Sequence, residues 1–365
     1  MCKIIIGISG VVGKLYTNGG IGMAKKCGFV ACVLLIAVLF MGCQQSGGKA
    51  AVSGPAGGEE IRIVVVPKVV HPWFDDLVSY SGLQAEELGR QLGRRIVIDY
   101  RAPTTADVVE QNSIIQQAAA TRPTGIAIDL LDYNGTAAVV EEVRRQGIPV
   151  VFFDAEAPDE SGIPQVGSPS ADQARIAAEC LAKAINYTGK VAIMRGVPTA
   201  PNHEARYDYY WEWFKQYPNI TLIQGGVDND DIQTAQQQAA AVIAANPDLA
   251  GYIGSNAAYP IGVGNAVREA GKTGQIKVVG LESMIETLEL IKEGVLYGTS
   301  TAPTAVQGSQ IVMLIWQQSM GNRVPLKINT GIDLVTIENV DDALAEARNI
   351  TLKDSSLKKY GIGQK

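Results

Sequence analysis

The stretch IRIVVVPKVVHPWFDDLVSYSGLQAEELGRQLGRRIVIDY, residues 61–100, determines the fold expected for this chain. It begins with a continuous apolar run from Ile61 to Pro67, typical of a strand buried on both faces. From Pro72 to Leu92 apolar side chains recur with a period near 3.6, which predicts a helix. The β-rich run RIVIDY follows that helix. A strand, a helix and a strand at this spacing predict a parallel pair joined by a crossover helix.

The same alternation continues along the chain and starts again near residues 164–169. Further strands are predicted at 125–131, 148–154, 189–196, 220–226, 249–255, 276–282 and 296–301. Further helices are predicted at 105–121, 136–146, 171–186, 202–216, 232–245, 257–270 and 285–293. We expect Thr104 or Thr105 to cap the first of these, and Asp228 or Asp230 could cap the helix at 232–245. These are too many strands for one compact sheet, so we expect an α/β protein with two doubly wound parallel-sheet lobes.

The first 59 residues follow a different pattern. Lys25 and Lys26 precede an uncharged run, Cys27 to Gly42, which is shorter than the roughly 20 residues of a membrane-spanning helix. A charged start, a short apolar centre and small residues at its end predict a signal peptide over 23–42, with 1–22 as a possible misassigned start. The segment LFMGC, residues 39–43, resembles the bacterial lipobox, which implies acylation of Cys43. Residues 43–59, rich in Gly, Ser and Ala, are expected to form a flexible tether to the membrane.

Composition excludes several classes of function. The net charge is −6 and basic runs are absent, which argues against nucleic-acid binding. Only Cys180 is left after the predicted signal and the lipidated cysteine, so we expect no disulfide within the mature chain. His71 and His203 are the two histidines, too few with one cysteine for a structural zinc cluster. No G-x-G-x-x-G follows the first strand and no hydrolase or P-loop motif is present, so we expect neither an enzyme nor a cofactor.

Ligands of doubly wound sheets bind beyond the carboxyl ends of the strands, and this rule selects a set of candidate residues. Each follows or ends a predicted strand or lies in the helix after it. The candidates are Lys68, His71, Trp73, Phe74, Asp154, Arg206, Asn229, Asn256, Glu282 and Thr301. For several the residues leave a structural alternative open. Phe74 also fits the apolar stripe of its helix, Lys68 could be a solvated lysine, and Arg206 could form a surface ion pair with Asp208 or Glu204.

These segments, in this order, resemble the periplasmic sugar-binding proteins of the ribose and galactose type, which serve ABC transporters. The resemblance covers nearly all of residues 60–337. It is carried by HPWFDDLVSYSGLQAEELG (71–89), IPVVFFDAEAP (148–158), NHEARYDYY (202–210), SNAAYPIG (255–262) and VVGLESM (278–284). It implies a type I periplasmic binding protein with hinges near Ser168, Thr301 and Ile332. The lobes would then be 60–168 plus 302–331 and 169–301 plus 332–365.

The resemblance also implies roles for the candidates. Trp73 and Phe74 would stack on the apolar face of a sugar ring. Asp154 would accept two hydroxyls, and the planar fork of Arg206 would reach adjacent sugar oxygens. The sequence departs from the usual pattern at Ala155, where the family often has Arg, and at Glu282, where it usually has Asp.

The leading hypothesis is therefore an exported, lipid-anchored monomer, in the periplasm or at the cell surface. It would bind a pentose, hexose or deoxyhexose and pass it to the permease of an ABC importer. A receptor for the signal autoinducer-2 is an alternative, motivated by Lys68, Asp154 and the segment 257–260, and a nucleoside- or polyol-binding lipoprotein is another. A transcription regulator with these lobes would need an N-terminal helix-turn-helix, where the sequence has a signal and a tether instead.

Overall fold

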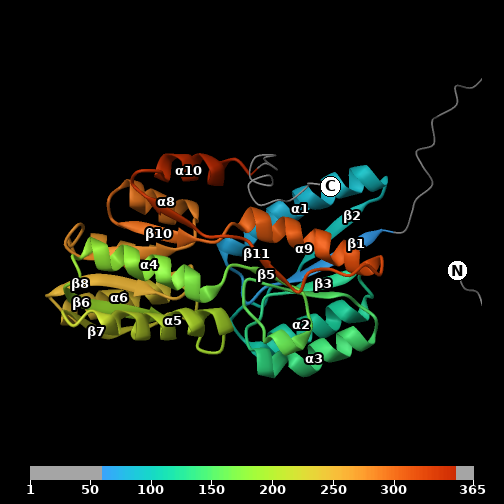
Figure 1. Cartoon of the computed structure of the whole chain (residues 1–365), viewed down its shortest axis with the longest axis horizontal. Helices are drawn as coiled ribbons and strands as arrows, with labels where there is room; N and C mark the ends of the chain where they lie inside the picture. The colour runs from blue at the N-terminus through green and yellow to red at the C-terminus, as the bar shows by residue number, and fades with distance from the viewer. Residues whose placement is uncertain (1–59, 351–365) are drawn as a thin grey trace, which may run out of the picture. The chain divides into compact units, whose positions relative to one another are not determined.

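The computed structural model describes residues 60–350, which belong to one compact unit of the chain. Within that range strands and helices alternate around two separate sheets, with helices on both faces of each sheet (Figure 1). None of the helices in residues 60–350 combines the length and the apolar character that a membrane crossing requires. The predicted signal peptide, Cys43 and the tether lie outside the described residues, as do residues 351–365.

The first sheet has the strand order β11-β5-β4-β3-β1-β2. Its strands are β1 (Ile61–Val66), β2 (Ile96–Tyr100), β3 (Gly125–Ile128), β4 (Val150–Phe153), β5 (Gln165–Gly167) and β11 (Lys327–Asn329). All neighbouring strands pair in parallel. Helices α1 (Pro72–Leu92) and α9 (Thr304–Ser319) pack against each other on one face. Helices α2 (Val108–Ala120) and α3 (Tyr133–Arg145) cover the other face, so the central strands are buried on both sides.

The second sheet has the order β12-β10-β9-β8-β6-β7. Its strands are β6 (Gly189–Arg195), β7 (Ile220–Val227), β8 (Leu249–Gly254), β9 (Lys277–Leu281), β10 (Gly298–Thr301) and β12 (Asp333–Thr336). Its helices are α4 (Ser170–Ala184), α5 (Pro201–Trp213), α6 (Ile232–Ala245), α7 (Tyr259–Glu269), α8 (Ile285–Lys292) and α10 (Val340–Arg348). Short 3-10 turns, η1 (Asp159–Ser161) and η2 (Phe214–Gln216), complete the elements. The edge strand β12 runs antiparallel to β10.

Local chemistry explains where α1 begins and ends, which matters because its first turn faces the cleft between the lobes. The His71 side chain accepts a hydrogen bond from the Trp73 N–H and so caps the helix. Pro72 occupies the first helical position, where its missing N–H is not needed. Gly93 ends the helix with a φ of 62°, in the left-handed region that suits glycine. These ends fix Trp73 and Phe74 at the carboxyl edge of the first sheet.

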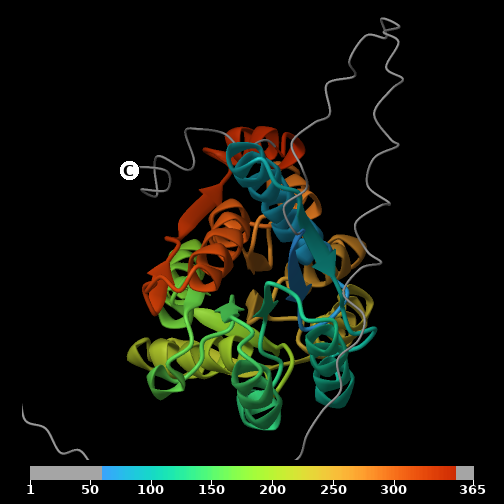
Figure 2. The same cartoon turned by 90° about the vertical axis from the view of Figure 1, so that its right-hand side faces the viewer.

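The chain passes between the two sheets three times: from β5 to α4, from β10 to α9 and from β11 to β12. Two of these crossings are tied together, because Ser168 Oγ lies 2.9 Å from Thr330 Oγ1 and donates to the Gly331 carbonyl. Figure 2, turned by 90°, shows the orange-red strand β11 running alongside the sheet formed by the first half of the chain. The predicted arrangement of two doubly wound lobes with three crossings is confirmed.

Two local predictions were wrong, and five strands and helices of residues 60–350 were not predicted. The strands β5, β11 and β12, each of three or four residues, were missed, as were the helices α9 and α10. The cap of α2 is Asp107, whose side chain accepts from the Val109 and Glu110 N–H groups, and not Thr104 or Thr105. The cap of α6 is Asp231, which accepts from the Thr234 N–H, and not Asp228 or Asp230.

Candidate functional site

A small cavity lies where the carboxyl ends of the two sheets face each other. The first lobe lines it with Lys68, His71, Trp73, Phe74 and Asp154, and the second with His203, Arg206, Asp230, Ala257 and Glu282. Seven of the ten predicted residues are in this set: Lys68, His71, Trp73, Phe74, Asp154, Arg206 and Glu282. The residues at this edge of the two sheets are charged or aromatic and mostly buried.

Lys68 follows β1 and is the counter-ion of two carboxylates. Its Nζ lies 2.6 Å from Asp129 Oδ2 and 2.9 Å from Asp154 Oδ2, and the side chain is 1% exposed. Burial lowers the pKa of Lys68, but the charges of Asp129 and Asp154 outweigh it and raise the pKa above its ordinary value. Lys68 is therefore not the solvated lysine considered from the sequence. Its ammonium is the counter-ion of two buried carboxylates, whether or not it also contacts a ligand.

Asp154 follows β4 and meets side chains of both lobes. Its φ of 56° lies in the left-handed region, uncommon for a residue other than glycine. Asp154 Oδ2 accepts from Lys68 Nζ and from Asn202 Nδ2, the latter at 2.6 Å, and Oδ1 lies 3.7 Å from an Arg206 guanidinium nitrogen. Burial raises the pKa of Asp154, but Lys68 and Arg206 outweigh it and lower the pKa below its usual value. Asp154 is therefore an ionised acceptor at the meeting point of the lobes.

Trp73 and Glu282 form a second contact between the lobes. Trp73 Nε1 donates to Glu282 Oε2 at 3.1 Å, and Glu282 also accepts from Gln173 Nε2 and from the Ala302 N–H. Burial raises the pKa of Glu282 to about 7. Phe74 stands edge-to-face against Trp73, with ring centroids 5.1 Å apart, and belongs to the core cluster of the first lobe while lining the cavity.

The two histidines present N–H donors to the cavity. His71 Nδ1 accepts from the Trp73 N–H, and His203 Nδ1 accepts from the Val197 N–H at 3.0 Å. Since Nδ1 is the acceptor in a neutral ring, the proton lies on Nε2 in both. Burial lowers the pKa of His203 well below its ordinary value, so His203 is neutral. His71 Nε2 is buried and has no protein partner.

Arg206 is buried and directed into the cleft. One terminal nitrogen donates to the Ser255 carbonyl at 3.2 Å, and the other lies near Asp154, while Nε has no protein partner. Glu204 pairs with Arg195 and Asp208 is exposed, so the surface ion pair considered for Arg206 is absent.

Asn256 is buried and is not among the residues that line the cavity, contrary to the prediction. Its Nδ2 donates to Asp228 Oδ1 and its Oδ1 accepts from the Tyr259 N–H, so the side chain fixes the β7–α6 loop to the start of α7. Asn229 does not line the cavity, contrary to the prediction: it is exposed, with a φ of 53°, while its neighbours Asp228 and Asp230 are buried. Asp230, which the prediction missed, is the residue of this loop that reaches the cavity.

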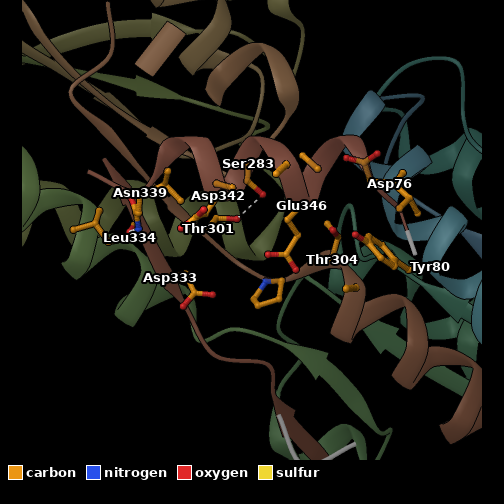
Figure 3. Close-up of a pocket in the computed structure, with 17 residues that line it drawn as sticks. Asp76, Tyr80, Ser283, Thr301, Thr304, Asp333, Leu334, Asn339, Asp342 and Glu346 are labelled. Atoms are coloured by element: carbon orange, nitrogen blue, oxygen red, sulfur yellow. Dashed lines mark hydrogen bonds between the residues drawn. The ribbon is translucent and has the colours of Figure 1, made fainter. Parts of the chain in front are cut away.

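Thr301 lies in a different cavity, also contrary to the prediction. Figure 3 shows this larger space, of about 690 Å³, with Thr301 Oγ1 hydrogen-bonded to Ser283 Oγ at 3.0 Å. The carboxylates that line it are Asp76, Asp333, Asp342 and Glu346. Among residues 60–350, none of its lining side chains has a buried polar atom without a partner. We therefore place the candidate site in the smaller cavity, where such atoms converge.

Sequence reasoning also missed Asn202 and His203. Both lie in the segment NHEARYDYY, which was singled out as following a strand, so the segment was identified but two of its polar residues were not. Asn202 is fully buried, and its Oδ1 lies 3.5 Å from Lys68 Nζ.

The cavity has a volume of about 20 Å³, room for about one water molecule. A sugar ring fits only if the lobes separate or the side chains between them move. Two lobes with a buried polar site between them define the class of two-lobed solute-binding proteins.

Comparison with known proteins identifies the family. The model of the periplasmic binding protein domain family matches residues 62–323, and the chain belongs to this family, as the resemblance predicted. It is 28% identical over 241 residues to the D-ribose/D-allose-binding protein of Pseudomonas aeruginosa, covering 63% of this chain and 75% of that protein. It is 22% identical over 246 residues to the D-apiose import binding protein of Actinobacillus succinogenes, covering 67% of this chain and 75% of that protein.

Solved structures show the same fold. An ABC transporter solute-binding protein from Agrobacterium vitis, bound with α-D-tagatopyranose, superposes with a TM-score of 0.71 at 26% identity, over 80% of this chain and 100% of that one. One from Burkholderia graminis, in complex with D-arabinose, superposes with a TM-score of 0.70 at 25% identity, over 76% and 96% of the two chains.

Proposed function

We propose that this chain is the lipid-anchored substrate-binding protein of an ABC importer and that it binds a monosaccharide between its lobes and delivers it to a permease. The observation that carries the proposal is the convergence of Asp154, Arg206 and Glu282 with histidine N–H donors in one buried cleft. Carboxylates accept strong charge-assisted hydrogen bonds from hydroxyl groups and guanidinium groups donate them to hydroxyl oxygens, so this set suits a polyol. The ligands named for similar proteins, ribose, allose, apiose, tagatose and arabinose, support a monosaccharide.

Each lining residue has a role in this proposal. Trp73 and Phe74 supply the apolar surface for the ring, and Asp154 accepts from two hydroxyls. His71 and Arg206 donate to ring or hydroxyl oxygens through nitrogens that have no protein partner. Trp73 and Glu282 hydrogen-bond across the cleft, so ligand entry has to break or bypass this contact.

The three chain crossings act as hinges in this proposal. The lobes 60–168 plus 302–331 and 169–301 plus 332–365 would open about Ser168, Thr301 and Ile332 and close on the ligand. Each lobe supplies about half of the cavity lining, so a monomer suffices for binding. The closed form would then dock on the permease.

Acylated Cys43 would hold the protein to the membrane, because two or more acyl chains give stable anchoring at about 0.8 kcal/mol per buried CH₂. Export would place it in the periplasm or at the cell surface. Expression of the full chain and of Cys43→Ala, followed by membrane fractionation, tests the anchor. The proposal expects release of the variant, while the matched Cys180→Ala variant stays with the membrane; retention of Cys43→Ala would exclude this anchor.

Thermal-shift and calorimetric titration of the full chain with pentoses, hexoses, deoxyhexoses and nucleosides tests the ligand class. A ligand at 100 times its Kd stabilises the protein by about 2.7 kcal/mol, a readily visible shift. Asp154→Asn and Arg206→Lys should weaken the binding found, and Asp99→Asn, a carboxylate of β2 outside the cleft, should not. Absence of any sugar binding by the folded protein would refute the proposal.

The autoinducer-2 hypothesis relied on Lys68 as a donor to the ligand. In the structure the Lys68 ammonium already contacts Asp129 and Asp154, so fewer of its N–H groups are free to donate to a ligand. The same titration should include this signal: binding of it together with rejection of all sugars would favour the alternative.

A further inference from the structure

The cleft contains more buried carboxylates than cations. Among residues 60–350, the charged groups packed around it are Asp129, Asp154, Asp228, Asp230 and Glu282 against Lys68 and Arg206. Both cations are directed at the carboxylates of the first lobe: Lys68 contacts Asp129 and Asp154, and Arg206 lies near Asp154. Lys68 and Arg206 thus offset Asp129 and Asp154, while the raised pKa values of Asp228 and Glu282 favour their neutral forms; in the described residues, Asp230 has no cation within ion-pair distance.

The three carboxylates of the second lobe lack a cation. In the described part of the chain, none of Asp228, Asp230 and Glu282 lies within ion-pair distance of a lysine, arginine or histidine. Glu282 accepts hydrogen bonds from the neutral donors of Trp73, Gln173 and Ala302. The charge of Arg206, which makes no ion-pair contact with Glu282, offsets part of the rise in pKa that burial causes. Burying an ionised carboxylate without a contacting counter-ion costs several kcal/mol, which is why the pKa values of Asp228 and Glu282 are raised. A positive charge on a ligand would offset this cost on the second-lobe side of the cleft.

Two carboxylate oxygens of the β7–α6 loop also lack hydrogen-bond partners. Asp228 Oδ2 and Asp230 Oδ1 are both buried and unpaired, and Asp230 lines the cavity. The other oxygen of Asp228 accepts from the Asp230 N–H and from Asn256 Nδ2. Burial and the charge of Asp230 raise the pKa of Asp228 well above its ordinary value. A hydroxyl group would supply a hydrogen bond here but no charge, whereas an ammonium group supplies both.

The opposite side of the cleft needs acceptors from the ligand. His71 Nε2 and Arg206 Nε are buried donors without a protein partner. Hydroxyl or ring oxygens satisfy such donors, so a simple alkylamine would leave them unpaired. The unpaired carboxylate oxygens and the unpaired N–H donors are therefore best satisfied by one small molecule that carries both a cation and several oxygens.

We propose that the ligand is an amino sugar, whose protonated amine lies against Asp230 and whose oxygens face His71 and Arg206. This proposal rests on the proposed function, since it specifies which monosaccharides the cleft prefers. A charge-assisted hydrogen bond contributes about 1–1.5 kcal/mol more than a neutral one, which corresponds to about a tenfold preference over the parent sugar.

The test is calorimetric titration of the full chain with three matched ligand sets. D-glucosamine and D-galactosamine carry the amine, D-glucose and D-galactose replace it with a hydroxyl, and the N-acetyl derivatives keep the nitrogen without its charge. The expected result is about tenfold tighter binding of an amino sugar than of its parent hexose. Asp230→Asn should abolish this preference, because it removes the charge that faces the amine. Asp208→Asn, an exposed carboxylate on α5, should keep the preference.

The outcomes separate the two proposals. Binding of neutral sugars as tight as or tighter than that of the amino sugars would overturn the amino-sugar inference and leave the proposed function intact. Failure of the folded protein to bind any sugar would overturn both. If Asp230→Asn does not fold, titration of the wild-type protein at about pH 9.5, where such amines are mostly neutral, replaces it. The preference should vanish there, and its persistence would overturn the inference.

Discussion

Replacing Lys68 by Met should destabilise the protein more than the loss of any surface lysine. The change keeps an unbranched side chain of similar length but removes the ammonium from between Asp129 and Asp154. Lys68 is 1% exposed and Asp129 is fully buried, so water cannot replace the lost contacts. Breaking a buried ion pair by removing one partner costs about 3–5 kcal/mol, because a charge remains buried without compensation. We expect a loss in this range.

Urea unfolding at pH 7, followed by circular dichroism, measures this loss. Lys215→Met is the matched control, since Lys215 pairs with Glu212 on an exposed surface and should change stability by less than about 1 kcal/mol. The double variant Lys68→Met/Asp129→Asn should recover part of the loss, because it removes one of the uncompensated charges. Equal stabilities of Lys68→Met and Lys215→Met, within about 0.5 kcal/mol, would show that Lys68 is not the counter-ion described here.

Two further predictions concern packing and pH. Gly308 on α9 lies against the Leu77 carbonyl of α1, so Gly308→Ala should destabilise by about 1–3 kcal/mol in thermal unfolding, whereas Gly82→Ala, with open space around it, should stabilise by about 0.5–1 kcal/mol. Because burial raises the pKa of Glu282 to about 7, its contribution to stability is present below about pH 4.5 and is lost as the pH rises through about 7. Glu282→Gln should reduce the decrease in the free energy of unfolding between pH 5 and 8 by up to about 3 kcal/mol. An unchanged pH dependence of that free energy would contradict the raised pKa.

The fold could be predicted from the sequence because its signals are long and repeated. Buried strands such as Ile61–Val66 are continuous apolar runs, and helices such as Pro72–Leu92 carry both periodicity and end signals. The strands Gln165–Gly167 and Lys327–Asn329 could not be predicted, because three residues carry no period and their pairing is long-range. The cap of α2 could not be chosen from the sequence, because Thr104, Thr105 and Asp107 are all good capping residues. The structure selects Asp107, since the helical backbone begins directly after it.

The sequence predicted which loops form the candidate site, but not which side chains of each loop line it. The strand-end rule found Asp154, Arg206 and Glu282, because the carboxyl ends of parallel strands must face one edge. It failed between Asn229 and Asp230, which both have a positive φ in one tight loop, so the direction of each side chain depends on backbone geometry that composition does not encode. It also missed Asp129, which lies inside the run predicted as a strand at 125–131 and whose role is visible only once Lys68 is placed beside it.

The contacts across the cleft constrain what a ligand must offer. Asp154 is held by Asn202 and Arg206 of the other lobe, and Trp73 is held by Glu282. A ligand that enters between the lobes has to replace these contacts, so its affinity is the difference between the bonds it forms and those it breaks. Neutral hydroxyls exchange one set of hydrogen bonds for another with modest gain. Among residues 60–350, no protein cation lies within ion-pair distance of Asp228, Asp230 or Glu282 on the second-lobe side of the cleft, so a ligand cation there gains an interaction without displacing a protein cation.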